Sequence, residues 1–385
     1  MIGISKITGY IPQKYVEMEE LATARGVDPQ KFLIGIGQEK MAIVGGNEDS
    51  VSMALNAGKR LIEDLDPKEI QAIKLVILAT ESSIDEAKAS ALFLEEYLDL
   101  PKNARYLELK EACYGATAGL NLAFERVTLH PDEKVLVIAS DLARYGLNSK
   151  GEVTQGAGSI ALLVENRLDL ALESLGKSTY HAENVSDFYR PMGQKEAIVD
   201  GPLSNETYLR FFKTVFEDYF RQSSLAPSDL KLINFHLPYT KIGLKALKEV
   251  ADQVDDSKYE SWIDLFNQGK AVNAVVGNIY TGSLYLNLLS NLLSGQVEEN
   301  DLLGMYSYGS GAQAEFFVLR SHKNFDSSSF QTMLQKRQGI SVENYEKHYC
   351  EQSYDLEQKW TSEGIRSGDF YLKSVENGNR KYDKA

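Results

Sequence analysis

The sequence contains little cysteine and no long apolar stretch. Only two of its 385 residues are cysteine, Cys113 and Cys350, which is too few for a disulfide framework or a cysteine-rich zinc site. No apolar run approaches the roughly 20 residues that a membrane-spanning helix needs. Residues 1–6 lack the basic flank and apolar core of a secretion signal and read instead as a first strand. We therefore expect a cytoplasmic protein in a reducing setting, with no membrane partner.

Positive charge is also in short supply. The formal net charge is -14 at pH 7, and no block of lysine and arginine is long enough to follow a phosphate backbone. Because affinity for nucleic acid depends on the neutralisation of many phosphates, we expect no nucleic-acid partner. A small polyphosphate ligand needs only a local basic patch, so the overall acidity does not exclude one.

Common cofactor motifs are missing as well. The two glycines of residues 35–37 lack the third glycine of a dinucleotide fingerprint, and residues 156–158 are not followed by the lysine and hydroxyl residue of a P-loop. The spacing of four histidines does not resemble that of metal ligands: His130, His181, His322 and His348. We expect neither a metal nor a tightly held cofactor.

The pattern of apolar residues predicts an α/β fold. Short apolar runs typical of fully buried strands alternate with longer amphipathic stretches typical of helices. The predicted strands lie at residues 75–79, 135–139 and 232–235, and the clearest helices at residues 50–62 and 208–220. Helices are therefore expected to cover a central sheet.

A faint internal repeat indicates a duplicated α/β unit. Three pairs of similar segments occur in the same order, and the distance between members drifts as loop insertions would make it drift. They are residues 75–79 with 232–235, residues 119–122 with 285–288, and residues 156–164 with 309–319. Chance could explain one pair, but three pairs in one order favour duplication.

We therefore predict three regions: an N-terminal half at residues 1–165, a C-terminal half at residues 166–320, and a polar extension at residues 321–385. The extension is rich in Tyr, Lys and Glu and lacks strong buried runs. Asn377 and Gly378 form a pair that favours a hairpin turn. We expect the extension to form helices or a hairpin packed on the outside of the core.

Cys113 is the first candidate for chemistry. Small residues follow it, and Leu120, Leu122 and Val127 then suit a buried helix. A thiol at a helix N-terminus faces the positive end of the macrodipole, which stabilises the thiolate, and the helical N–H groups there can hold an oxyanion. The alternative is that Cys113 is a small buried apolar residue. This segment alone leaves both interpretations open.

Five segments in order then point to one family. Residues 79–85, 111–116, 234–239, 277–283 and 307–311 resemble hydroxymethylglutaryl-CoA synthase of the bacterial type, and the resemblance runs to about residue 320. It implies the thiolase-like fold of condensing enzymes, in which two pseudo-equivalent halves stack as helix, sheet, helix, sheet and helix. It also implies a homodimer that acts on acyl-CoA substrates.

The implied activity is that of an acyltransferase of the mevalonate pathway of isoprenoid biosynthesis. It condenses acetyl-CoA with acetoacetyl-CoA and water to give 3-hydroxy-3-methylglutaryl-CoA and CoA. Cys113 matches the nucleophile, Glu81 the general acid/base, and His236 the histidine at the acetoacetyl site. A thioester on cysteine keeps the acetyl methyl protons acidic. A carboxylate after a buried strand, partly desolvated, has a pKa raised towards the range that suits their removal.

Glu81 and His236 each also have an interpretation without a catalytic role. Glu81 on its own would be a solvated loop carboxylate, and His236 a satisfied core histidine. The repeat, however, places both residues near the ends of pseudo-equivalent strands. We therefore expect them to face one site between the two halves.

The resemblance further implies a set of substrate-binding residues. Asn278 and Ser310 are expected against the acetoacetyl thioester. Independently of the resemblance, Lys241 and Lys245 lie at i, i+4 on one helix face beside His236, and we expect this basic face to hold the CoA phosphates. The other members of the implied shell are Asp141, Tyr145, Thr154, Asp187 and Tyr208. Alternatives are a helix cap for Asn278, solvated lysines, and ordinary packing for Tyr145, Thr154 and Tyr208.

Three rival functions remain compatible with these residues. A ketoacyl synthase III-like enzyme would use acyl carrier protein with Cys113, His236 and Asn278, but Glu81 would then be surplus. A synthase that adds β-branches to polyketide chains would share the whole site. A non-enzymatic thiolase-fold scaffold comes last, because it gives no reason for a nucleophile, a carboxylate and a histidine in matching segments.

Overall fold

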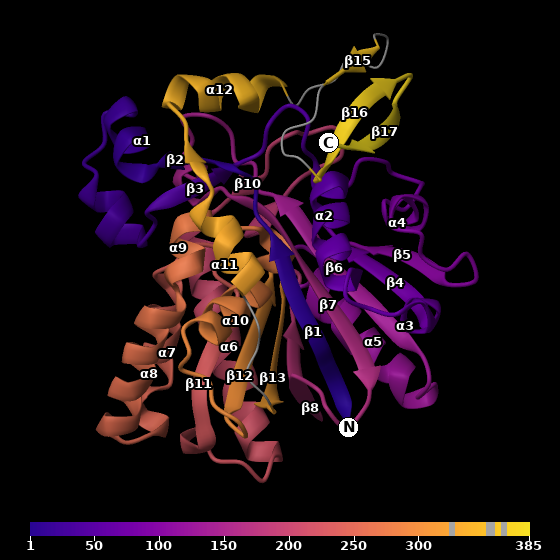
Figure 1. The fold of residues 1–385 in the computed structure, drawn as a ribbon. Helices are drawn as coiled ribbons and strands as arrows, with labels where there is room; N and C mark the ends of the chain where they lie inside the picture. The colour runs from indigo at the N-terminus through magenta and orange to yellow at the C-terminus, as the bar shows by residue number, and fades with distance from the viewer. Residues whose placement is uncertain (323–327, 352–358, 363–367) are drawn as a thin grey trace.

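The computed structural model describes residues 1–322, 328–351, 359–362 and 368–385. Within them, nine strands form one mixed sheet in the order β11-β12-β13-β8-β1-β7-β6-β4-β5. The N-terminal half contributes β1 (Ile2–Tyr10), β4 (Ile73–Ala79), β5 (Arg105–Leu109), β6 (Lys134–Leu142) and β7 (Ala157–Asn166). The C-terminal half contributes β8 (Leu172–Ala182), β11 (Leu230–Phe235), β12 (Leu302–Gly309) and β13 (Gln313–Ser321). The two halves, the first coloured indigo to magenta and the second mostly pink to orange, lie side by side in Figure 1.

The two half-sheets repeat one pairing scheme. β4 and β6 pair in parallel, as do β11 and β12. β7 pairs antiparallel with β6 and β1, just as β13 pairs antiparallel with β12 and β8. The halves meet where β1 pairs with β8 over only two residue pairs. The predicted strands and the duplicated unit are thus confirmed.

The main helices form the layers around these half-sheets. α5 (Gly115–Leu129) and α10 (Ser283–Leu293) lie between them, where α5 packs on β4, β6 and β7, and α10 on β11 and β12. α2 (Ser50–Ile62) covers the outer face of the N-terminal half, and α6 (Gly201–Gln222) that of the C-terminal half. The predicted order of helix, sheet, helix, sheet and helix is confirmed.

The remaining described elements are mostly short. The helices are α1 (Met18–Ala24), α3 (Pro67–Gln71), α4 (Ala91–Tyr97), α7 (Ile242–Glu249), α8 (Asp256–Gly269), α9 (Ala271–Val276), α11 (Ser328–Gln335) and α12 (Val342–Glu351). The strands are β2 (Lys14–Glu17), β3 (Lys40–Ile43), β9 (Phe188–Tyr189), β10 (Ile198–Val199), β14 (Gln338–Gly339), β15 (Trp360–Thr361), β16 (Phe370–Glu376) and β17 (Asn379–Lys384). A π-helical turn spans Lys31–Ile36, and 3-10 turns span Glu152–Thr154, Pro227–Asp229, Ala251–Gln253 and Tyr280–Gly282.

Local sequence explains where the two outer helices begin. Asp49 accepts a hydrogen bond from the backbone N–H of Ser52, whose hydroxyl accepts one from the N–H of Asp49, so α2 starts with a capping box. α6 starts after Asp200, which caps the N–H of Leu203, and it carries Pro202 in its first turn. The apolar side chains of both helices then face the sheet.

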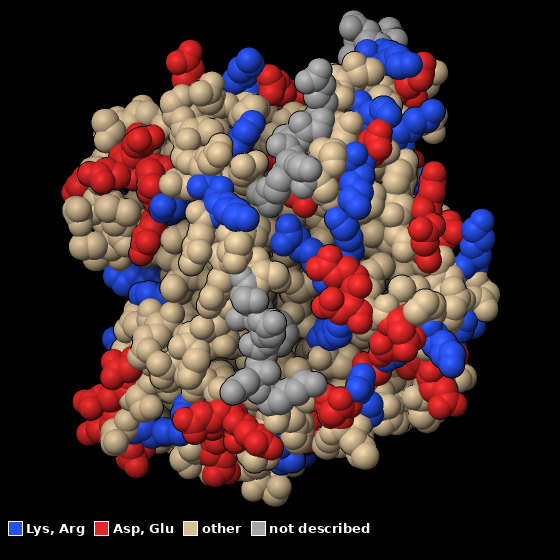
Figure 2. Space-filling view, viewed as in Figure 1, with Lys and Arg blue, Asp and Glu red and all other residues tan. Residues whose placement is uncertain are grey.

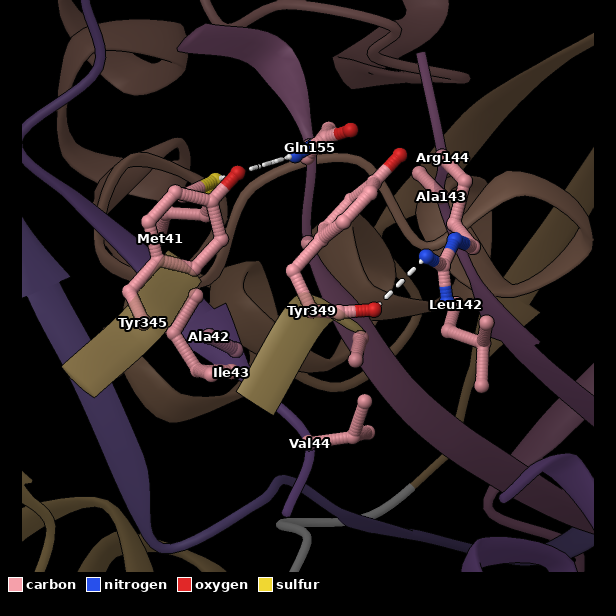
Figure 3. Close-up of a pocket in the computed structure, with 12 residues that line it drawn as sticks. Met41, Ala42, Ile43, Val44, Leu142, Ala143, Arg144, Gln155, Tyr345 and Tyr349 are labelled. Carbon is pink, nitrogen blue, oxygen red and sulfur yellow. Dashed lines mark hydrogen bonds between the residues drawn. The ribbon is translucent and has the colours of Figure 1, made fainter. Parts of the chain in front are cut away.

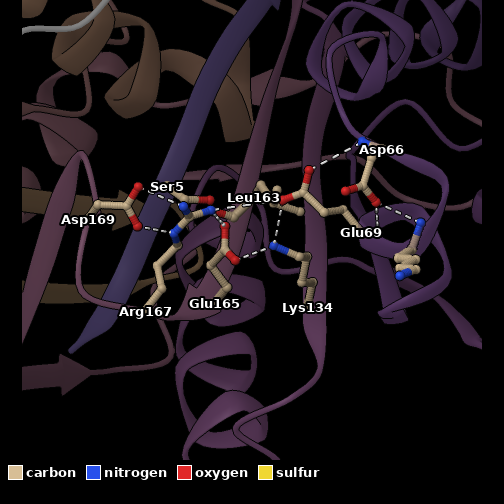
Figure 4. Close-up of polar contacts among 9 residues, drawn as sticks. Ser5, Asp66, Glu69, Lys134, Leu163, Glu165, Arg167 and Asp169 are labelled. Atoms are coloured by element: carbon tan, nitrogen blue, oxygen red, sulfur yellow. Dashed lines mark hydrogen bonds and ion pairs between the residues drawn. The ribbon is translucent and has the colours of Figure 1, made fainter.

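A network of charged side chains lies at the amino end of β6. Lys134, the first residue of β6, forms ion pairs with Glu165 of β7 and with Glu69 of α3 (Figure 4). Arg167, just after β7, pairs with Glu165 and Asp169. Because Lys134 and Glu165 are both buried, each charge needs the other. This network lies at the opposite end of β6 from Asp141.

The C-terminal extension packs on the core through strands and through the helices α11 and α12. β14 pairs with β2, and β16 and β17 form a hairpin that turns at Asn377 and Gly378, with φ of 50° and 76°. The predicted hairpin turn is therefore confirmed. Although the extension is polar in composition, it also contributes apolar side chains to the core, because Leu372, Val375 and Tyr382 are buried. Residues 323–327, 352–358 and 363–367 lie outside the described residues, and the boundaries at 165 and 320 stay predictions.

The described surface carries mixed charge. On the face shown in Figure 2, lysine and arginine side chains lie singly or in small groups among acidic ones. Within the described ranges, every helix is too short or too polar to cross a lipid bilayer.

Candidate active site

Residues of both halves line a cavity of about 640 Å³. That volume lies within the roughly 300–1,000 Å³ typical of small-molecule sites. Seven of the twelve predicted site residues line it: Cys113, Tyr145, Thr154, Tyr208, His236, Asn278 and Ser310. The structure therefore brings together residues that lie far apart in the sequence.

Cys113 lies two residues before α5 and is buried. Its Sγ donates a hydrogen bond to Oε1 of Glu81 at 3.2 Å. The preceding residue, Ala112, has a φ of 41°, an uncommon left-handed conformation for a residue with a side chain. Such backbone strain persists only where surrounding contacts impose it. The thiol and the carboxyl predicted to act together are thus in direct contact.

The loop that carries Ser310 approaches Cys113 closely because Gly309 has no side chain. A Cβ on Gly309 would lie 2.7 Å from Cβ of Tyr114 and 2.8 Å from the carbonyl oxygen of Glu111. Both distances are shorter than real Cβ atoms show, so only glycine permits this approach.

Asp141 holds the loop that carries Glu81. It is fully buried and accepts hydrogen bonds from the hydroxyls of Thr80, Ser82 and Thr281 and from the backbone N–H groups of Glu81, Ser82 and Thr281, at 2.5–3.2 Å. Asp141 does not line the cavity. Its place in the structure is a support beneath Glu81 rather than a contact with the cavity.

The pKa of Glu81 is raised to about 8. Burial is the main cause, and the negative charge of Asp141 adds to it, while the hydrogen bond from Cys113 and the charge of Arg190 oppose it. A carboxyl with a pKa near the working pH can both accept and release a proton. This agrees with the raised pKa that we expected for Glu81.

The pKa of the Cys113 thiol is also raised, well above its ordinary value, by burial and then by the charge of Glu81. The expectation that the end of α5 stabilises a thiolate is therefore wrong for the unliganded site. The physical reason is that Cys113 is desolvated and faces two carboxylates, Glu81 and Asp141. In the resting site the sulfur is a thiol, and a base must accept its proton.

His236 follows β11 directly and is 2% exposed. Burial lowers its pKa to about 3, so the imidazole is neutral at neutral pH. Its Nδ1 is buried without a hydrogen-bond partner among the described residues. A buried polar atom in a native protein normally has a hydrogen-bond partner. The alternative interpretation, in which His236 is a core histidine with its hydrogen bonds satisfied, is therefore wrong.

Asn278 makes local hydrogen bonds before α10 and also lines the cavity, while its contact with the acetoacetyl thioester stays a prediction. Its Oδ1 accepts hydrogen bonds from the N–H of Tyr280 and the hydroxyl of Ser283, which begins α10. Its Nδ2 donates to the hydroxyl of Tyr145 at 3.3 Å. The ring of Tyr145 packs edge-on against Phe188 and Tyr280, with centroids 5.9 Å and 6.0 Å apart. Asn278 thus caps local backbone and also presents its amide to the cavity.

Three more predicted residues lie in the wall of the cavity or directly behind it. Asp187 is fully buried, does not line the cavity, and accepts hydrogen bonds from the Tyr308 hydroxyl and the Gly311 N–H at 2.8 Å and 2.9 Å. Tyr208 lines the cavity and donates to the carbonyl oxygen of His236. The carbonyl oxygen of Thr154 accepts the N–H of Asn278. Asp187, like Asp141, therefore holds a loop of the site in place.

The two predicted lysines lie beside the cavity rather than in its wall. Lys241 precedes α7 and donates to the carbonyl oxygen of Ile34, and Lys245, exposed on α7, donates to the hydroxyl of Tyr239. Tyr239 lines the cavity, and so does Lys150, a lysine that the sequence analysis missed. Basic side chains thus lie around the cavity, but the lysine in its wall is Lys150 and not Lys241 or Lys245.

Sequence reasoning also missed Arg190, whose guanidinium donates to the carbonyl oxygen of Glu81. A signal for it existed, because Arg190 belongs to the same short segment as Asp187. Tyr308 lies likewise within the segment that carries Ser310. Gln155, which accepts the backbone N–H of Tyr145 at 2.7 Å, had no such signal.

A polar seam joins the nucleophile's helix to the other half. Glu315 of β13 is buried and accepts hydrogen bonds from the hydroxyl of Tyr114 at 2.5 Å and from the amide of Asn121. One turn along, Thr117 donates to the hydroxyl of Ser307. These side chains recur on one face of α5 and fix its start, and with it Cys113, against β12 and β13.

This arrangement can carry out covalent acyl transfer with proton transfer. It joins a thiol nucleophile, a carboxyl whose pKa lies near 8, and a neutral imidazole with an unpartnered nitrogen. Among the described residues, no group of three or more His, Cys, Asp or Glu side chains could hold a metal ion.

Comparisons with known proteins agree on one family. The family model described as hydroxymethylglutaryl-coenzyme A synthase N terminal matches residues 1–168, and the model described as its C terminal matches residues 259–385. The chain is 44% identical to hydroxymethylglutaryl-CoA synthase of Enterococcus faecalis, over 91% of this chain and 92% of the relative.

Two further similarities place the chain within that family. A crystal structure of HMG-CoA synthase complexed with CoA matches with a TM-score of 0.93 at 37% identity, over 100% of both chains. The polyketide biosynthesis 3-hydroxy-3-methylglutaryl-ACP synthase of Bacillus subtilis is 29% identical, over 89% of this chain and 87% of the relative. The chain is thus more similar to the CoA-named synthase of Enterococcus faecalis than to the ACP-named synthase of Bacillus subtilis.

The raised pKa of Cys113 predicts slow alkylation of the free enzyme. With iodoacetamide near neutral pH, we expect exposed Cys350 to react at least about tenfold faster than Cys113, because the thiolate is the reactive form. Mass spectrometry of the two cysteine peptides over time measures both rates in one sample. Faster labelling of Cys113 would show that the site stabilises its thiolate after all.

Proposed function

The chain belongs to the hydroxymethylglutaryl-CoA synthase family, and we propose that it condenses acetyl-CoA with acetoacetyl-CoA through an acetyl group carried on Cys113. It is an enzyme, an acyltransferase. The observation that carries the residue assignment is the 3.2 Å contact between Sγ of Cys113 and Glu81 at a cavity that His236 also lines.

In the first step the Cys113 sulfur attacks the carbonyl of acetyl-CoA. The thiol proton leaves, the acetyl group passes to sulfur, and free CoA is released as a thiol. The backbone N–H groups of Cys113 and Ser310 are the proposed donors to the oxyanion that forms on the way. Burial raises the pKa of this thiol, so bound substrate and a nearby base must make the proton's departure possible.

In the second step Glu81 removes a proton from the methyl group of the acetyl thioester. The resulting carbon nucleophile attacks the ketone carbon of acetoacetyl-CoA, and a carbon–carbon bond forms. The ketone oxygen becomes an alkoxide that takes up a proton. The neutral imidazole of His236 and the amide of Asn278 are the proposed hydrogen-bond donors to it.

In the last step water cleaves the thioester on Cys113. The product leaves with a free carboxylate at that end and its CoA thioester at the other, and the thiol is restored. Every step uses side chains of this chain, so we propose that the reaction needs no metal or cofactor. Lys150, Lys241 and Lys245 are the proposed partners of the CoA phosphates.

CoA is the preferred carrier of the substrate. Identity of 44% to the CoA-dependent relative against 29% to the ACP-named one supports this choice over a carrier-protein substrate. Glu81 in contact with the nucleophile also gives the carboxylate a task that a ketoacyl synthase III-like enzyme would not have. We further propose a cytoplasmic enzyme of the mevalonate pathway.

We also propose a homodimer that forms through β5 and its neighbours. β5 is at the edge of the sheet, where backbone groups can pair with another strand. Exposed leucines gather on the adjoining elements α4, β5 and α5, which share one side of Figure 1. Leu122 of α5, which we expected to be buried, is 41% exposed, and Leu107 of β5 is 40% exposed. A partner subunit would cover both side chains.

Isotope-labelled acetyl-CoA tests the covalent step. The wild-type protein should retain the acetyl group, and Cys113→Ala should not. Glu81→Ala should still acquire the label, but its condensation rate should fall by about 10²–10⁴-fold, the usual contribution of a general base. Label retained by Cys113→Ala would reject the nucleophile, and near-normal condensation by Glu81→Ala would reject the base.

The pKa of Glu81 predicts the pH dependence of condensation. Below about pH 8 the carboxyl is mostly protonated and cannot accept the methyl proton, so the rate should rise as pH increases through that value. The measurement is a single turnover of the pre-acetylated enzyme with acetoacetyl-CoA. A flat profile between neutral pH and pH 9 would contradict a catalytic carboxyl with the pKa of about 8 found here.

Charge placed on β5 should dissociate the dimer. We expect the wild-type protein to sediment at twice its chain mass of 43.0 kDa and Leu107→Glu at the chain mass, because the buried carboxylate would lack a partner. Leu168→Glu is the matched control, since Leu168 is 83% exposed and lies between β7 and β8. If Leu107→Glu sediments at the same mass as the wild-type dimer, the interface does not include β5.

A further inference from the structure

We propose that α12, in the C-terminal extension, positions Tyr145 for the condensation step, and that Tyr345 and Tyr349 are the positioning residues. This inference rests on the function proposed above, because it assigns the cavity wall around Tyr145 and Asn278 to the acetoacetyl substrate. It gives the extension a task at a site to which the described residues of the extension contribute no lining side chain.

The first connection runs from Tyr345 through Gln155. The hydroxyl of Tyr345 accepts a hydrogen bond from Nε2 of Gln155 at 2.9 Å (Figure 3). Oε1 of Gln155 in turn accepts one from the backbone N–H of Tyr145 at 2.7 Å. Tyr345 and Gln155 are 2% and 3% exposed. Buried amides and hydroxyls of this kind hold one geometry, because a lost partner leaves a desolvated polar atom.

The second connection runs through Tyr349 to the residues on both sides of Tyr145. The hydroxyl of Tyr349 accepts the backbone N–H of Gly146 at 3.0 Å. Arg144 stacks on the Tyr349 ring at 3.9 Å and donates to the Tyr349 carbonyl oxygen at 2.9 Å (Figure 3). Three consecutive residues of the loop, 144–146, are therefore tied to α12.

α12 itself is held firmly enough to act as a support. Glu152 is buried, forms a bidentate pair with Arg25 of the N-terminal region, and accepts the hydroxyl of Tyr345 at 3.1 Å. Arg25 also pairs with Glu346 of α12 at 2.7 Å. Lys14 of β2, the strand that pairs with β14, contacts His348 of α12 at 2.8 Å.

The position of Tyr145 affects one step more than the other. Its hydroxyl contacts Nδ2 of Asn278, the group proposed to meet the acetoacetyl thioester. Cys113 and Glu81 instead depend on α5 and on Asp141, and their hydrogen bonds to each other and to Asp141 join residues outside α12. A displaced Tyr145 should therefore slow carbon–carbon bond formation while acetyl transfer to Cys113 continues, because small misplacements of a positioning group are costly in rate.

Hydrogen exchange of the free full-length protein tests the support directly. In Tyr345→Phe and Tyr349→Phe, the Tyr145 and Gly146 amides should exchange about 3–10-fold faster than in the wild type, since each change removes one hydroxyl. Tyr382→Phe is the matched control, because Tyr382 is a buried tyrosine of the same extension whose hydroxyl donates to Asp49 at 2.8 Å. It should leave residues 144–146 unchanged. Unchanged exchange in both test variants overturns the proposal.

Kinetics test the consequence. The ratio of condensation rate to acetylation rate should fall about tenfold or more in Tyr345→Phe and stay at the wild-type value in Tyr382→Phe. In a Tyr145→Phe background, Tyr345→Phe should have little further effect, because the helix acts through the hydroxyl that is already missing. Full additivity, or an equal fall in Tyr382→Phe, overturns the positioning role.

The hydrogen-exchange and kinetic experiments together distinguish a failure of this proposal from a failure of the proposed function. A wild-type protein that forms no hydroxymethylglutaryl-CoA would reject the function and, with it, any role of α12 in condensation. Amide exchange would then still show whether α12 holds residues 144–146. A wild-type protein that condenses normally, with variants whose rate ratio is unchanged, would reject the positioning role alone.

Discussion

The carboxylate of Asp141 is the interaction on which the rest of the site depends. Its six hydrogen bonds join the end of β4, the end of β6 and the turn before α10. A buried charge is tolerated there because its acceptor positions are satisfied by hydroxyl and N–H donors. The same charge, close to Glu81, adds to the burial that brings the Glu81 pKa to about 8. One side chain thus fixes the position of the proposed base and contributes, after burial, to its proton affinity.

The two halves differ in what they supply to the cavity. The N-terminal half brings the thiol and the carboxyl, and the C-terminal half brings His236 and Asn278, which follow β11 and precede α10. The seam of Tyr114, Thr117 and Asn121 against Ser307 and Glu315 keeps these sets in register. Duplication therefore provides two similar strand ends, and divergence gives each end its own chemistry.

Sequence reasoning correctly predicted the parts of the structure that the local pattern of apolar residues determines. The strands at 75–79 and 232–235 and the helix at 50–62 were predicted because burial leaves a clear period or an apolar run in the sequence. It failed where contacts between distant residues decide the outcome. The pKa of Cys113 is raised by burial and then by carboxylates on other elements, and Leu122 is exposed because of where α5 packs. The contact of Tyr345 with Gln155 spans 190 positions and has no local signature.

The narrow junction of β1 with β8 has a consequence for synthesis of the protein. The strands of the first half-sheet occupy residues 2–166, and those of the second begin at Leu172, so the ribosome completes one half before the other. The polar groups of α5 that meet β12 and β13 can find these partners only after the second half has been synthesised. The contacts that fix Cys113 against the other half are therefore the last of the site to become available during synthesis.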